Sequence, residues 1–207
     1  MGLMTGQVPM ATMGPMELRQ AGIPGLHLRT AGRGKTSRFR QLMGSIERLN
    51  ALDIPVDAAR PLAGRLVRNE RLRNVLHGQA TGIPLHPILT DVPFGAWFMA
   101  VFLDLFPDAG TQRAATRLVG LGVISAVPTA LSGWAEWALA DRKTQRVGVV
   151  HAGLNASAVL IFAGSWAARR RGRRRLGVGL ARLGAVVLIA GGFTGGYMGR
   201  DRQEDRP

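Results

Sequence analysis

The stretch Gly82–Phe106, which reads GIPLHPILTDVPFGAWFMAVFLDLF, constrains the fold more than any other part of the chain. Pro87 suits the first turn of a helix, where a missing N–H costs nothing. The apolar run that follows is roughly 20 residues long, about what a helix needs to cross a ~30 Å hydrocarbon layer. The run also carries His86, Asp91 and Asp104, and ionisable groups inside a span are costly enough to mark functional sites. The stretch therefore predicts a membrane-spanning helix that carries polar groups.

Three further apolar segments follow, and the four together predict an all-α integral membrane four-helix bundle. The spans are expected over 86–106, 118–140, 148–168 and 176–198. Because the connecting segments are short, neighbouring spans should pack antiparallel. The predicted domain organisation is a disordered basic leader, amphipathic juxtamembrane helices, a four-span domain and a charged tail, over 1–40, 41–81, 82–199 and 200–207.

One or two amphipathic surface helices are expected before the first span. Apolar residues recur every three to four positions over 41–53, and Pro55 is predicted to end that helix. A second helix is expected from Val56–Asp57 to Leu76, with arginines among its leucines. A basic amphipathic helix beside a span is typical of the membrane surface, although a solvated basic face has the same pattern. Residues 1–40 mix Gly, Pro, Met, Thr and Arg without periodicity, which predicts disorder.

Composition excludes several kinds of chemistry. The chain has 207 residues, a net charge of +14 and no cysteine, so it forms no disulfide and no Cys-ligated zinc or iron–sulfur site. The charge alone could indicate nucleic acid, but the arginines cluster beside apolar segments, as in loops that flank membrane helices. We therefore expect the lipid bilayer as partner, and no nucleic acid. Anionic lipid headgroups are expected at the arginine run Arg169, Arg170, Arg171, Arg173, Arg174 and Arg175.

The distribution of basic residues leaves the orientation nearly balanced. Arginines and lysines flank the spans on both sides in similar numbers, so the positive-inside rule does not decide between the two orientations. The basic leader, which lacks the apolar core of a signal peptide, favours a cytoplasmic N-terminus in the cell membrane. The dense arginine run between the third and fourth spans favours the opposite. We expect the N-terminus to be cytoplasmic.

Antiparallel threading places several polar residues in one leaflet, the one nearer the N-terminus. His86 and His151 are the two histidines of residues 82–199, and they are the candidate cofactor-binding residues. His151 and Asn155 are at positions i and i+4, so they share one face of their helix. The whole polar cluster comprises His86, Asp91, Glu136, Asp141, His151, Asn155 and Tyr197.

Several interpretations of this polar cluster stay open. Two imidazoles that face each other across a bundle could ligate a b-type haem. The same histidines with a carboxylate could bind a divalent metal, carry protons or bind a quinone. The plainest interpretation is structural. In it His86 caps the first span, His151 and Asn155 bond backbone carbonyls, and Asp91 caps a helix that restarts at Pro93.

Four segments of the chain resemble a bacterial membrane-protein family, domain-of-unknown-function family twenty-two thirty-one. They are HGQATGIPLHPILTDVPFGAWFMAVFLDLF, PTALSGWAEWA, RVGVVHAGLN and GGFTGGYMG, within residues 55–200. The resemblance implies a four-span membrane domain. Some members carry a Rieske-type iron–sulfur domain, which implies a neighbourhood of electron transfer but transfers no catalytic residue. The family motif often reads G-H-P-L-H-P, whereas Ile83 stands here at the first histidine position, and Tyr197 with a charged tail stands where the family often has a further histidine.

These observations predict a non-enzymatic membrane component that is accessory to electron transfer, with a redox protein as a candidate partner. The first alternative is a haem- or metal-binding membrane redox protein that uses His86 and His151. The second alternative is a small transporter or proton pathway. It ranks lower because the sequence shows no internal repeat of the kind that many transporters carry.

Overall fold

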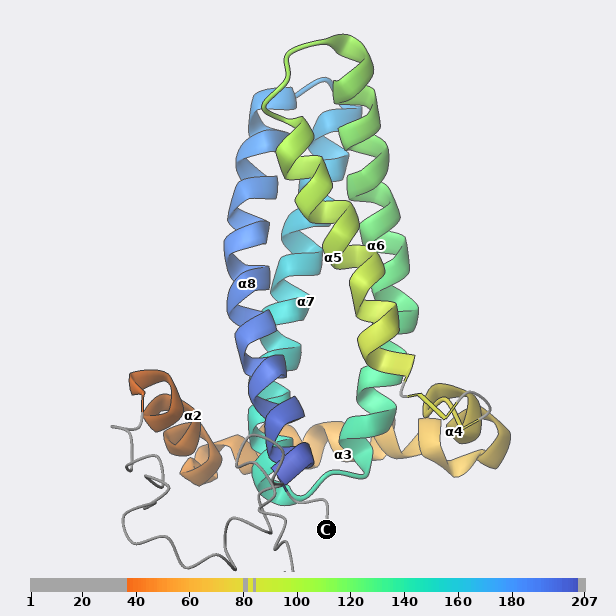
Figure 1. Ribbon diagram of the computed structural model, residues 1–207, viewed down its shortest axis with the longest axis vertical. Coiled ribbons are helices and arrows are strands. Elements are labelled where there is room, and N and C mark those ends of the chain that lie inside the picture. Colours follow the sequence, from red (N-terminus) through yellow and green to blue (C-terminus); the bar gives the residue numbers. More distant parts are fainter. Residues whose placement is uncertain (1–36, 80–81, 84, 205–207) are drawn as a thin grey trace, which may run out of the picture. The chain divides into compact units, whose positions relative to one another are not determined.

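The computed structural model describes residues 37–79, 82–83 and 85–204, and the described residues from Arg38 onward form one compact unit. Figure 1 shows four long helices side by side, with three shorter helices across the end that we call the near end. The opposite end, where the first long helix meets the second and the third meets the fourth, is called the far end. The helices are α2 (Arg38–Arg48), the 3₁₀ helix η2 (Asn50–Leu52), α3 (Asp53–Arg68), α4 (Glu70–Leu76), α5 (Leu85–Leu103), α6 (Ala109–Ala138), α7 (Arg142–Arg170) and α8 (Arg174–Glu204).

The predicted all-α, four-span architecture is confirmed. Helices α5 to α8 are each long and apolar enough to cross a membrane. No more than 39% of the apolar window of any of them is buried inside the bundle, so most of that surface faces outward. Large side chains such as Phe98, Leu160 and Val186 cover it. This outer surface contacts the lipid bilayer, and the chain is a multi-pass membrane protein.

Helices α6 and α7 begin several residues before the apolar spans predicted from the sequence, because an aspartate caps each of them. The Asp108 carboxylate accepts a hydrogen bond from the Thr111 N–H at 2.8 Å. The Asp141 carboxylate accepts from the Lys143 and Thr144 N–H groups at 2.8 and 3.2 Å. A side-chain cap satisfies N–H groups that have no partner within the helix, so each helix can begin in a polar turn.

The juxtamembrane helices differ in their boundaries from those predicted. Pro55, predicted to end the first helix, lies in the first turn of α3, where proline is tolerated. The second predicted helix is divided at Asn69, whose extended backbone ends α3 and whose side chain accepts from the Leu72 N–H at 3.1 Å. Helix α8 continues through Glu204 into the predicted charged tail. The predicted disordered leader lies outside the described residues as far as residue 36.

A stacked pair of rings fills the centre of the bundle. Trp97 of α5 and Phe162 of α7 are buried, with their ring centroids 4.3 Å apart and their planes 2° from parallel. The Trp97 indole N–H donates to the Val119 carbonyl at 3.2 Å. Each ring needs a glycine on the following helix, because a Cβ at Gly122 would collide with Trp97 and a Cβ at Gly184 would come within 2.9 Å of Phe162. The stack therefore joins α5 to α7.

A buried ion pair joins the same two helices toward the far end. The Arg169 guanidinium donates to both carboxylate oxygens of Asp104, at 2.7 and 2.5 Å, and the two side chains are 2% and 0% exposed. Arg169 also donates to the Ser165 hydroxyl at 3.1 Å, and that hydroxyl donates to the Gly177 carbonyl at 2.6 Å. Arg169 was predicted to meet lipid headgroups. It does not, because its charge is balanced inside the bundle.

Removing one member of this ion pair should destabilise the bundle strongly. Asp104→Ala leaves the Arg169 guanidinium buried and uncompensated, which costs about 3–5 kcal/mol. The loss should appear as a lower unfolding midpoint in detergent micelles. Asp108→Ala is the matched control, since it removes an exposed helix cap and should cost much less stability than the loss of the buried pair. Equal losses for the two variants would contradict the importance of the pair.

Candidate functional site

His86 lies in the first turn of α5 and is hydrogen-bonded to α6. Its Nδ1 lies 3.0 Å from the Thr129 carbonyl oxygen and 3.2 Å from the Ser132 hydroxyl. Because a carbonyl oxygen only accepts, Nδ1 carries a proton, and in the neutral form of the ring Nε2 has the lone pair. Gly133 makes room for the ring, since a Cβ there would come within 2.7 Å of the imidazole.

His151 has the same surroundings on the next pair of helices. Its Nδ1 lies 2.9 Å from the Gly191 carbonyl oxygen and 3.1 Å from the Thr194 hydroxyl of α8. By the same argument Nδ1 donates the proton and Nε2 keeps the lone pair. Gly195 makes room for this ring, with a hypothetical Cβ at 2.9 Å. Both histidines therefore have one tautomer, set by a carbonyl of the following helix.

A polar side chain four residues after each histidine bonds that histidine's own carbonyl. The Thr90 hydroxyl donates to the His86 carbonyl at 2.7 Å, and the Asn155 amide donates to the His151 carbonyl at 2.9 Å. The Asn155 amide nitrogen also lies 3.3 and 3.2 Å from the two ring nitrogens of His151. An atom almost equidistant from both nitrogens lies over the ring and not in its plane. The Asn155 amide therefore does not occupy the in-plane lone pair of Nε2.

These matching contacts show that α5–α6 and α7–α8 are two equivalent hairpins. Asp104 and Arg169 are 65 residues apart. The same interval separates Trp97 from Phe162 and His86 from His151. Equivalent residues of α6 and α8 are also separated by a constant number of positions in the sequence. These pairs are Gly122 and Gly184, Thr129 and Gly191, Ser132 and Thr194, and Gly133 and Gly195.

The interface between the two hairpins is therefore built from equivalent positions. The ring stack and the ion pair each join one position of α5 to its counterpart on α7. The two histidines occupy a third pair of equivalent positions on α5 and α7. The sequence shows no evident internal repeat, yet the contacts recur at equivalent positions of the two hairpins. Few residues are identical between the hairpins, and the clearest shared pattern is the L-x-x-L-G that ends at Gly122 and at Gly184.

Of the other predicted cluster residues, only Asn155 lies with a histidine. Asp91 is exposed on the outer face of α5. The Tyr197 hydroxyl donates to Glu47 of α2 at 2.8 Å, so this residue joins α8 to a surface helix. Glu136 is half-buried in the last turn of α6. Within the described residues, no three His, Cys, Asp or Glu side chains gather as a metal site would require.

Asp91 does not cap a restarted helix, because α5 is continuous through Pro93. Proline lacks the N–H that would bond the Leu89 carbonyl. The Thr129 hydroxyl replaces that donor, at 2.9 Å from the Leu89 oxygen. Thr129 thus has two contacts with α5: its carbonyl accepts from His86, and its hydroxyl donates to the Leu89 carbonyl that Pro93 leaves without a donor. Neither contact is evident from the position of Thr129 in the sequence.

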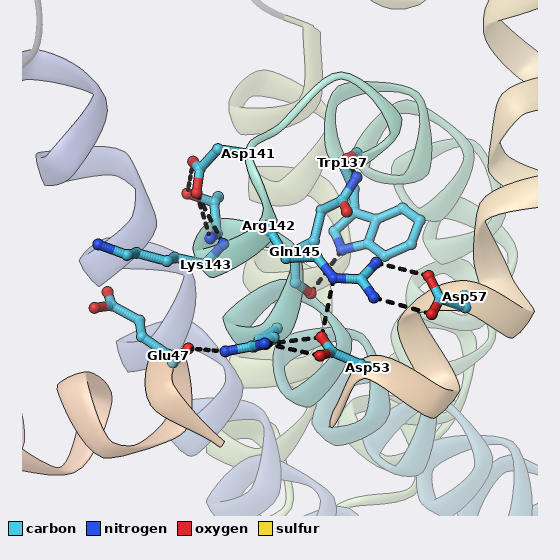
Figure 2. Close-up of polar contacts among 10 residues, drawn as sticks. Glu47, Asp53, Asp57, Trp137, Asp141, Arg142, Lys143 and Gln145 are labelled. Atoms are coloured by element: carbon cyan, nitrogen blue, oxygen red, sulfur yellow. Dashed lines mark hydrogen bonds and ion pairs between the residues drawn. The ribbon is translucent and has the colours of Figure 1, made fainter. Parts of the chain in front are cut away.

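A second polar network fixes the surface helices to the near end of the bundle (Figure 2). Arg142 donates to Asp53 at 2.9 Å and, through both terminal nitrogens, to Asp57 at 2.7 and 2.9 Å. Arg146 donates to Asp53 at 2.9 and 2.8 Å and to the Glu47 carbonyl at 2.7 Å. Two arginines one turn apart on α7 therefore hold both α3 and the end of α2.

Aromatic packing extends this network to the end of α6. The Trp137 indole N–H donates to the Gln145 carbonyl at 2.9 Å (Figure 2), across the turn between α6 and α7. Val56 and Ala63 of α3 pack with Trp137 in a small apolar core. Hydrogen bonding by Arg146, with the nearby Arg142 charge, lowers the pKa of Asp53, and hydrogen bonding by Arg142 lowers the pKa of Asp57. Both carboxylates therefore stay ionised at neutral pH.

The comparisons with known proteins agree with this architecture. The family model described as Predicted membrane protein (DUF2231) matches residues 82–203. That range includes α5 to α7 and nearly all of α8, and with them both histidines. No curated protein and no solved structure matches the chain significantly.

We expect acid to detach α3 from α7 only at a pH below the ordinary pKa of an aspartate. The folded pKa of Asp53 lies below its ordinary value of 3.8. The contact is therefore fully present above pH 3.8 and is lost as the pH falls through the folded pKa. Tryptophan emission, which reports Trp137 beside α3, should stay constant down to pH 4 and shift below it. Asp53→Asn should show the shifted emission at neutral pH, whereas Glu70→Gln should not. An emission shift centred above pH 4 would contradict this assignment.

Proposed function

Because the chain belongs to the family described as Predicted membrane protein (DUF2231), whose description gives no activity, we propose its function from the paired histidines. The protein is a non-enzymatic membrane component of an electron-transfer system, and it ligates a b-type haem between His86 and His151. Such a haem would supply one-electron redox chemistry within the bundle. The residues of the chain would position the two ligands and shield them from water.

The observation that carries this proposal is the shared hydrogen-bonding pattern of the two imidazoles. Each Nδ1–H donates to a helix carbonyl, at 3.0 Å for His86 and 2.9 Å for His151. Ligating histidines commonly donate their second ring N–H in this way, which fixes the tautomer and orients the ring. Both Nε2 atoms thereby keep the lone pair that haem iron requires.

The repeat gives the proposal its second support. Equivalent positions on α5 and α7 already meet twice across the bundle, as the ring stack and as the ion pair. A ligand held between the two histidines would occupy a third position of the same interface. The divalent-metal alternative is less well supported, because the carboxylate of Asp91 is exposed on the outer face of α5 and cannot complete a ligand set with the histidines.

The absorption spectrum of the purified protein tests haem binding directly. Detergent-solubilised protein should show a Soret band that shifts when dithionite is added. His86→Ala and His151→Ala would each remove one of the two proposed haem ligands and should abolish or shift that band. His77→Ala is the matched control, since His77 caps α4 outside the spans and should leave the spectrum unchanged.

The haem assignment would be contradicted if folded protein, mixed with haem and then separated from unbound haem, showed no Soret band. The two Nδ1 hydrogen bonds would then be structural, as in any buried pair of helices. The accessory function would rest on a redox partner, which would be sought by co-purification from the native membrane.

We also propose that the near end faces the cytoplasm and that the membrane is the cell membrane. Four exposed arginines lie on α3 and α4 beside the spans, and basic residues next to a span favour the cytoplasmic side. They are Arg60, Arg65, Arg68 and Arg71.

Single-cysteine labelling can decide the orientation, because the natural chain has no cysteine. Asn50→Cys places a thiol at the near end and Arg171→Cys places one at the far end, both at exposed positions. In intact cells an impermeant maleimide should label only the Arg171→Cys variant. Labelling of Asn50→Cys instead would reverse the orientation, and permeabilised cells provide the control for reactivity.

A further inference from the structure

The arginines of the far end do not form one uniform patch. Arg169 is buried against Asp104, whereas Arg171, Arg173 and Arg175 are exposed. Arg174, at the start of α8, instead borders a hollow of about 450 Å³ against the first turns of α6. The hollow is lined by Ala109, Gln112, Arg113, Thr116, Arg117, Arg169 and Arg174.

Three of the guanidinium groups around this hollow have no counterion. Arg113, Arg117 and Arg174 make no ion pair within the part of the chain that the structure describes. The Nε of Arg174 is buried and has no hydrogen-bond partner there. A buried donor without a partner is costly, and an anion in the hollow would satisfy it. The nearby Asp108 is already engaged by the Thr111 N–H at 2.8 Å.

An apolar groove continues from the basic hollow down the outer face of the bundle. The two depressions share Thr116 and Arg117. Leu121 and Ile124, which are 49% and 63% exposed, form one wall, and Trp166 forms the other. The floor lies at Gly120, where a Cβ would come within 2.8 Å of the Trp166 ring. The Arg170 guanidinium lies over that ring, 5.4 Å from its centroid.

We propose that this composite site binds an anionic phospholipid. The phosphate lies among Arg113, Arg117 and Arg174, and one acyl chain follows the groove past Leu121 and Ile124 against Trp166. Three uncompensated cations match a phosphate whose negative charge is not offset by a cation in the same headgroup. The apolar groove lies on the lipid-facing side of a span, so it favours a lipid over free phosphate. This inference does not depend on haem binding.

Trp166 provides a local probe of the acyl chain. Bromine on an acyl chain quenches a tryptophan that it touches, and the other three tryptophans lie in the bundle centre or at the near end. The Trp166 signal is obtained as the difference between the wild-type protein and Trp166→Phe. In phosphatidylcholine vesicles that contain a minor fraction of brominated lipid, brominated phosphatidylglycerol should quench this signal with at least about fivefold higher apparent affinity than brominated phosphatidylcholine.

A matched pair of double variants distinguishes binding at this specific site from general electrostatic attraction to the basic far end. Arg113→Gln with Arg117→Gln should abolish the preference for phosphatidylglycerol. Arg171→Gln with Arg173→Gln removes the same charge from the neighbouring turn and should preserve it. Circular dichroism and gel filtration would confirm that both variants are folded. Inorganic phosphate at millimolar concentration should not displace the brominated lipid.

Three outcomes would overturn the proposal. The first is equal quenching of wild-type protein by the two brominated lipids, which requires no variant and so does not depend on folding. The second is an equal loss of preference in both double variants, which would indicate a diffuse basic surface. The third is competition by inorganic phosphate, which would indicate a phosphate site that does not use the groove.

Discussion

The buried ion pair between Asp104 and Arg169 is the interaction on which the arrangement of the bundle depends. Two opposite charges without water are tolerated only when each completes the other's hydrogen bonds, and here the guanidinium meets both carboxylate oxygens and the Ser165 hydroxyl. This requirement fixes the axial register of α5 against α7. The stack of Trp97 on Phe162 then falls at the level where glycines on α6 and α8 leave room for the rings.

The same register brings the two histidines to equivalent positions nearer the other end of the bundle. Polar groups between helices in a membrane must find partners, because lipid offers none. The chain meets that demand in the same way in both hairpins, with a helix carbonyl and a neighbouring hydroxyl for each Nδ1–H. The duplicated solution leaves two equivalent ring nitrogens with lone pairs, which is the chemical basis of the proposed haem site. Asp91 does not belong to the proposed site, because it is exposed on the outer face of α5.

The arginines at the two ends of the bundle differ in whether they form ion pairs. At the near end Arg142 and Arg146 are used internally, because they hold α3 and α2 through Asp53, Asp57 and the Glu47 carbonyl. At the far end one arginine is used internally and several remain uncompensated around a hollow and a groove. The uncompensated arginines of the far end therefore lie where a lipid headgroup can meet them.

The sequence by itself determined the class of the fold, since apolar runs of spanning length and short connections permit little besides an antiparallel helical bundle. It also identified His86, His151 and Asn155, because ionisable or amide groups in a span stand out against apolar neighbours. It misplaced the ends of the surface helices, which depend on the cap at Asn69 and on contacts with α7. Only the tertiary structure decided which polar residues meet. The partners of both histidines are backbone carbonyls and small hydroxyls on a later helix, and these have no distinctive sequence signal. The repeat was likewise hidden, because the hairpins share contacts at equivalent positions while the residues that make them, such as tryptophan against phenylalanine and aspartate against arginine, differ.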